Sequence, residues 1–181
     1  MLSRTVTRVL AGALLAALPL LGTAPANASA HAVTTVYYDN EAGSAWSAAV
    51  STAIANWNAA LTNVQFAPGD ASDSTVELVA DSGWPETETD SPGSGTVYLG
   101  EEAVTEGYDR TRITAHELGH ILGLPDNYNG DCSILMSGHS AGTSCTNAKP
   151  ATSEASEVDS IFADGGSSAA RQRTYTDAAA R

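Results

Sequence analysis

Apolar residues recur at helical spacing over residues 45–61. The apolar positions stand three or four residues apart, which predicts a helix with one buried stripe, formed by Trp46, Val50, Ile54, Trp57 and Leu61. Ser44 precedes this run and is expected to cap its first turn. Tryptophans at helical spacing are usually core residues, so we interpret the stripe as packing surface rather than as a ligand site.

Two further helices are predicted downstream. Residues 111–122 form a periodic segment that ends at Gly123, a residue favoured directly after a helix. Pro125 then prevents the helix from resuming. Residues 154–163 predict a third helix, with Glu154 and Glu157 near its positive N-terminal end.

Short runs of β-branched and aromatic residues predict strands at residues 33–38, 64–67, 75–80 and 96–99. Residues 81–95 are rich in Gly, Ser and acids and are expected to form a surface loop, and residues 125–150 an irregular segment. The predicted fold class is therefore α+β. A small twisted mixed sheet has a backing helix, a second helix and a mostly irregular C-terminal part.

The two ends of the chain differ in composition from the middle. Residues 1–30 have a basic start with Arg4 and Arg8, then a short apolar run, and they end in A-x-A-like sites. This is the layout of a secretory signal peptide. The apolar run is shorter than the roughly 20 residues of a membrane span. We expect one secreted domain over residues 31–166, followed by a disordered Ser/Ala/Arg-rich tail over residues 167–181.

The charge of the chain excludes some partners. Without residues 1–30 the chain keeps 6 basic and 21 acidic residues, a net charge of −15. Such a surface repels nucleic acid and anionic membranes, so we expect neither as a partner. In an exported chain, Cys132 and Cys145 are expected to form a disulfide, worth roughly 3 kcal/mol for a loop of this length.

The segment His116-Glu117-Leu118-Gly119-His120 carries the main chemical signal. Histidines four residues apart project from the same face of a helix and can share one ion. Glu117 lies beside them, where its carboxylate can reach a water on the metal without being a ligand. This division of roles is typical of zinc metalloproteases.

A catalytic zinc usually has three protein ligands and one open position. Gly123 permits a sharp turn after the helix, so Asp126, six residues past His120, can swing back onto the ion. The alternatives for the third ligand are His139, in a Ser/Gly-rich loop, and Glu154 or Glu157. The spacing HExxHxxGxxD favours Asp126.

Taken together, the signal-like start, the HExxHxxGxxD run and the later segment Cys132-Ser133-Ile134-Leu135-Met136-Ser137-Gly138 resemble the snapalysin family. Its members are small neutral proteases of actinomycetes, grouped with the metzincin-like zinc proteases. The resemblance spans residues 33–165. It implies a secreted zinc endopeptidase with a metzincin-like fold that cleaves proteins or peptides before Tyr or Phe, and we expect it to act as a monomer.

The resemblance also implies roles for single residues. His116, His120 and Asp126 would bind Zn²⁺, with Glu117 as the catalytic glutamate and Met136 in a turn beneath the metal. Tyr128 would donate a hydrogen bond to the developing oxyanion, and Asp109 and Thr111 would bind a structural Ca²⁺. The competing hypotheses are a secreted zinc-binding protein without activity and a zinc amidase or aminopeptidase.

Overall fold

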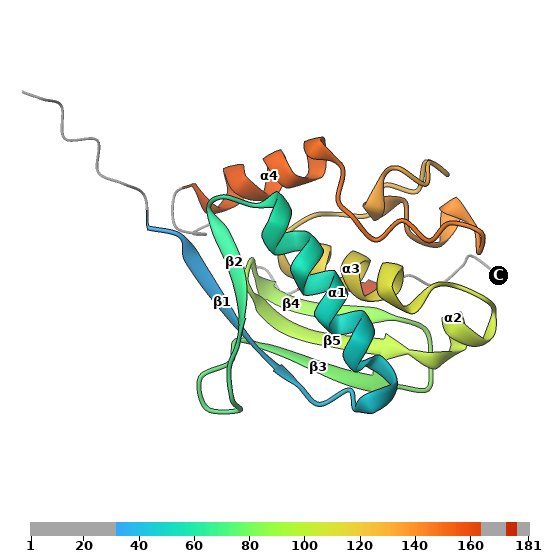
Figure 1. Cartoon of the computed structure of the whole chain (residues 1–181), viewed down its shortest axis with the longest axis horizontal. Coiled ribbons are helices and arrows are strands. Elements are labelled where there is room, and N and C mark those ends of the chain that lie inside the picture. Colours follow the sequence, from blue (N-terminus) through green and yellow to red (C-terminus); the bar gives the residue numbers. More distant parts are fainter. Residues whose placement is uncertain (1–31, 164–172, 177–181) are drawn as a thin grey trace, which may run out of the picture. The chain divides into compact units, whose positions relative to one another are not determined.

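The computed structural model describes residues 32–163 and 173–176, which form one sheet with helices (Figure 1). The signal-peptide prediction lies outside these residues. In chain order the elements are β1 Thr34–Asn40, α1 Ser44–Ala60, β2 Val64–Pro68, β3 Val76–Asp81, β4 Glu86–Ser91, β5 Ser94–Gly100, α2 Glu101–Thr105, α3 Arg110–Ile121, the 3₁₀ helix η1 Leu135–Ala141, α4 Thr152–Phe162 and β6 Arg173–Thr176.

The sheet has the strand order β2-β1-β3-β5-β4-β6. The β1–β2, β1–β3 and β3–β5 pairs are parallel, whereas β4 pairs antiparallel with both β5 and β6. The mixed sheet and the helices confirm the α+β prediction.

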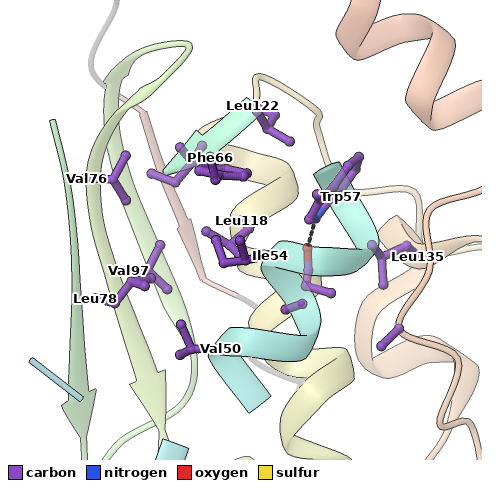
Figure 2. Close-up of a cluster of buried hydrophobic side chains, with 14 of the residues drawn as sticks. Val50, Ile54, Trp57, Phe66, Val76, Leu78, Val97, Leu118, Leu122 and Leu135 are labelled. Carbon is purple, nitrogen blue, oxygen red and sulfur yellow. Dashed lines mark hydrogen bonds between the residues drawn. The ribbon is translucent and has the colours of Figure 1, made fainter. Parts of the chain in front are cut away.

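One face of the sheet forms the core with α1 and α3. Val76, Leu78 and Val97 point from the strands toward the two helices, which lie on the same side of the sheet (Figure 2). All five residues of the predicted apolar stripe on α1 are buried, which confirms that stripe as core. The indole Nε1 of Trp57 donates to the carbonyl oxygen of Ala115 at 2.8 Å and so fixes α1 against α3.

The helix starts differ in how they are capped. The N-cap of α1 is Gly43, with no side-chain hydrogen bond, so the prediction of Ser44 as the cap is wrong: Ser44 is already the first helical residue. At α3 the N-cap is Asp109, whose carboxylate accepts from the backbone N–H of Arg112 at 2.9 Å. Such a cap stabilises a helix by about 1 kcal/mol.

Two segments without a predicted strand each contain one. The expected loop at residues 81–95 contains β4, and the expected disordered tail contains β6. The pattern Glu86-Thr87-Glu88-Thr89 alternates in burial, with both threonines buried. Because neither alternating residue type is apolar, the alternation carried no hydrophobic signal.

The irregular C-terminal part is held by the Cys132–Cys145 disulfide, with a Cα–Cα distance of 5.6 Å, as predicted. Within the described ranges, the helices are all too short or too polar to cross a bilayer.

Candidate metal centre

The structure brings His116, His120 and Asp126 together at the end of α3. Asp126 Oδ1 lies 3.2 Å from His116 Nε2 and 3.3 Å from His120 Nε2. Both histidines are buried, and the carboxylate side chain is 22% exposed. Over the described residues, this is the group of His, Cys, Asp and Glu side chains whose ligand atoms lie close enough to share an ion.

Backbone carbonyls hold both imidazole rings through their other nitrogen. His116 Nδ1 lies 3.1 Å from the Leu135 carbonyl oxygen, and His120 Nδ1 lies 2.8 Å from that of Leu124. Because a carbonyl oxygen only accepts, Nδ1 of each ring carries the proton and donates it. The lone pair of each Nε2 then faces Asp126, the tautomer that a metal-binding histidine requires.

The two separations from Asp126 Oδ1 to the histidine Nε2 atoms fit a small tetrahedral ion. Zinc-to-ligand bonds of about 2.0–2.1 Å place tetrahedral ligand atoms roughly 3.3 Å apart. The measured 3.2 and 3.3 Å separations match this value. The buried atoms His120 Nε2 and Asp126 Oδ1 make no hydrogen bond, and buried polar atoms usually have a partner. The group therefore fits zinc.

Gly123 delivers Asp126 to the histidines. Its φ of 98° is unfavourable for residues with a side chain, which confirms the predicted sharp turn. A carboxylate binds a metal in its ionised form, and an aspartate with the ordinary pKa of about 3.9 is ionised at neutral pH.

Glu117 is fully buried beside the histidines and contacts β4. The hydroxyl of Thr87, also fully buried, lies 2.7 Å from Glu117 Oε2 and 3.2 Å from the backbone oxygen of Glu117. A hydroxyl donates one proton, and the shorter distance assigns it to the carboxylate. Thr87 therefore orients Glu117 from the neighbouring strand.

Met136 packs against α3 at Gly119, and its role in a turn beneath the metal stays a prediction. It is 2% exposed, and a Cβ placed on Gly119 would lie only 2.5 Å from its sulfur. Any side chain at position 119 would therefore force the Met136 side chain to move. The Met136 carbonyl also accepts from the backbone N–H of Asn127 at 2.8 Å, which holds the residue next to Asp126.

Two buried charged side chains hold the segment around Met136. Glu154 accepts from the backbone N–H groups of Leu135 and Met136 at 3.1 and 2.7 Å. Arg112 donates to the carbonyl of Asn147 at 2.6 Å and to the hydroxyl of Ser137 at 3.0 Å. Glu154 is thus engaged in bracing the turn, which argues against its alternative role as third ligand; Glu157 is exposed.

The remaining predicted site residues are Tyr128, Asp109 and Thr111. The Tyr128 ring is 45% exposed and lies 4.7 Å, centroid to centroid, from the ring of His139. Its role toward an oxyanion therefore stays a prediction. Asp109 caps α3, as described above, and Thr111 follows in the first turn.

Two residues that the sequence interpretation did not select contact the site. Thr87 lies in β4, and Tyr175 lies in β6, where its ring stacks on that of His120 with centroids 4.0 Å apart and an interplanar angle of 5°. An isolated threonine and a tail tyrosine carry no motif. Only the strand pairing brings them to the metal-binding histidines.

Residues 32–165 match the model of the Streptomyces extracellular neutral proteinase (M7) family. Three relatives are each named extracellular small neutral protease. The chain is 40% identical to that of Streptomyces coelicolor (81% of this chain, 67% of the relative), 41% to that of Streptomyces lividans (77% and 62%) and 40% to that of Streptomyces caespitosus (72% and 98%). The chain thus spans about two thirds of the two longer relatives and nearly all of the shortest.

Proposed function

The chain belongs to the Streptomyces extracellular neutral proteinase (M7) family, and on this basis we propose that it is an extracellular, zinc-dependent endopeptidase. The observation that carries the proposal is the convergence of His116, His120 and Asp126 beside the buried carboxylate of Glu117. The names of the relatives support an extracellular protease, with proteins or peptides as substrates.

The residues of the site divide into ligands and a base. His116 Nε2, His120 Nε2 and Asp126 Oδ1 would hold the zinc ion. When bound, zinc supplies a Lewis acid that activates water and polarises the substrate carbonyl. Glu117 accepts the proton of the attacking water and returns it to the leaving amine. Thr87 keeps the Glu117 carboxylate in position for both transfers.

Three finer features belong to the proposal. The family resemblance implies cleavage before Tyr or Phe and assistance of the oxyanion by Tyr128, and we expect the chain to act as a monomer. The net charge of the full chain, −13, supports the exclusion of nucleic acid and anionic membranes as partners. The intact Glu117 favours catalysis over a purely structural zinc site, which needs no base.

The first experiment separates metal binding from catalysis. Glu117→Gln should keep one zinc per chain, measured by elemental analysis, and lose at least about 10³-fold in kcat on casein peptides, because the amide cannot accept a proton. Asp126→Ala should lose zinc as well as activity, because one of three ligands is removed. Near-normal activity of Glu117→Gln would overturn the proposed base. Full zinc occupancy of Asp126→Ala would overturn the ligand set.

A structural Ca²⁺ at Asp109 and Thr111 is proposed from the resemblance alone. If calcium binds there, it should raise the thermal midpoint of the zinc-loaded wild type, because a ligand of the folded state stabilises it. The shift should vanish in Asp109→Asn. An equal shift in both proteins, or no shift in the wild type, would show that calcium does not bind at Asp109 and Thr111. Asp109 would then act only as a helix cap.

A further inference from the structure

The C-terminal strand β6 covers the outer edge of the sheet next to the metal centre. It pairs antiparallel with β4, and the register places Tyr175 opposite Thr87, the residue that hydrogen-bonds Glu117. Thr89 pairs with Arg173 at one end and Glu86 with Thr176 at the other. The pairing thus includes the residue that orients the proposed base.

Side chains add to the backbone pairing at two places. The Tyr175 ring lies flat on the ring of His120, with centroids 4.0 Å apart. The hydroxyl of Thr176 donates to the carboxylate of Glu86 at 2.8 Å. A strand that only covered a sheet edge would need neither contact. The stack on a proposed metal ligand therefore ties β6 to the site itself.

An extended peptide binds to an exposed sheet edge through main-chain hydrogen bonds. Without β6, the edge beside Glu117 would be β4. The backbone of β4 cannot pair with β6 and with another extended peptide on the same side at once. Hence any peptide that uses this edge to reach the metal centre must first displace β6.

We propose that Arg173–Thr176 is a tethered inhibitor strand, which occupies the place of an extended peptide substrate on β4 and is displaced when substrate binds. The inference rests on the proposed function, because it requires a peptide-cleaving site beside His120. It assigns a role to a segment outside residues 32–165, the part matched by the family model.

A tethered strand competes well even when its own affinity is low. Its effective concentration near the site is on the order of millimolar for a short tether. The strand has only four residues, and Thr174 and Thr176 are exposed, so its displacement exposes little apolar surface. A weak, reversible block of this kind raises the apparent KM and leaves kcat unchanged, because saturating substrate displaces the strand.

The test compares substitutions in the full-length, zinc-loaded chain. Tyr175→Ala removes the stack on His120 and should lower the KM for a peptide substrate about three- to tenfold at unchanged kcat, the range expected for loss of one aromatic pair. Tyr175→Phe keeps the ring and should behave as wild type. Tyr37→Ala removes an exposed tyrosine from β1, outside the site, and should have no effect.

An unchanged KM in Tyr175→Ala would overturn the proposal, as would an equal change in the Tyr37→Ala control. A fall in kcat with Tyr175→Ala would also overturn it, because the residue would then assist the reaction instead of blocking it.

A binding measurement separates this inference from the proposed function. A synthetic peptide of residues 170–181 is titrated by calorimetry into Glu117→Gln, with and without Tyr175→Ala. The peptide should bind at least about threefold more tightly to the double variant, whose own strand competes less, and a peptide with Ala at position 175 should lose this binding. Equal affinities would overturn the tethered strand. If the peptide binds more tightly to the double variant but the wild-type chain has no peptidase activity, the tethered strand is supported and the proposed function is rejected.

Discussion

At the scale of single residues, the site combines local and distant contributions. His116, His120, Asp126 and Glu117 lie within eleven consecutive positions, so helix geometry and one turn suffice to predict their convergence. Thr87 lies 30 residues before Glu117 in the sequence, and its contact depends on how β4 packs against α3. A hydrogen-bond partner this distant in sequence can be identified only from the folded structure.

The Thr87 hydroxyl is expected to matter for turnover. Thr87→Val keeps the shape but removes a hydrogen bond to a buried carboxylate, worth about 1.5–3 kcal/mol. We expect kcat to fall about 10- to 100-fold at nearly unchanged KM and zinc content. Steady-state kinetics with metal analysis measures this split.

Thr87→Ser serves as the matched control, because it restores the hydroxyl and should recover most of kcat. A valine variant with normal kcat would show that Glu117 needs no partner from β4. A loss of zinc would indicate a structural defect instead.

At the scale of elements, the sequence predicts the three longer helices α1, α3 and α4 to within a few residues, and four of the six strands. Their apolar positions alternate or recur with a clear period. The strand β4 has threonines on its buried face and acids on the other, so its pattern resembled a polar loop. The short helix α2 and the 3₁₀ turn around Met136 were missed because their residues are fixed by tertiary contacts, such as those from Glu154 to Leu135 and Met136.

Helix α4 is fixed to the α1–β2 connection by Asp159. Its carboxylate accepts from the backbone N–H groups of Thr62 and Asn63, at 2.9 and 2.8 Å, and from the Thr62 hydroxyl at 2.7 Å. Burial raises the pKa of Asp159, but these hydrogen bonds outweigh burial and lower it below the usual 3.8. The ionised form is therefore favoured in the folded state.

This shift gives a pH dependence of defined sign. A lowered pKa stabilises the fold above the unfolded-state pKa of 3.8, and this stability is lost as the pH falls toward the lower folded-state value. Asp159→Asn should therefore lower the thermal midpoint by a few degrees at pH 7. The difference from wild type should shrink below about pH 4, as measured by calorimetry. A gap that widens in acid would contradict the assignment.

At the scale of the whole molecule, the acidic composition dominates. The chain carries 21 acidic and 8 basic residues, and like charges repel in the compact state. Salt screens this repulsion, because the Debye length falls from about 30 Å at 0.01 M to about 8 Å at 0.15 M. We expect the thermal midpoint to rise by a few degrees over this range.

The same charge should influence the choice of substrate. A peptide with lysines outside its cleaved bond should show a lower KM at low salt than at high salt, and a matched peptide with glutamates the reverse. Parallel salt responses of the two peptides would indicate that the net charge plays no part in substrate capture.

The alternation in β4 has a further consequence for how copies of the protein meet one another. Glu86, Glu88 and Asp90 stand along the strand that forms the rim of the sheet whenever β6 leaves. Two such rims approaching each other would bring rows of negative charge together, which opposes the edge-to-edge joining that leads to aggregation and fibrils. If β6 is displaced, β4 can therefore pair with a substrate peptide, whereas charge repulsion opposes its pairing with β4 of a second copy of the chain.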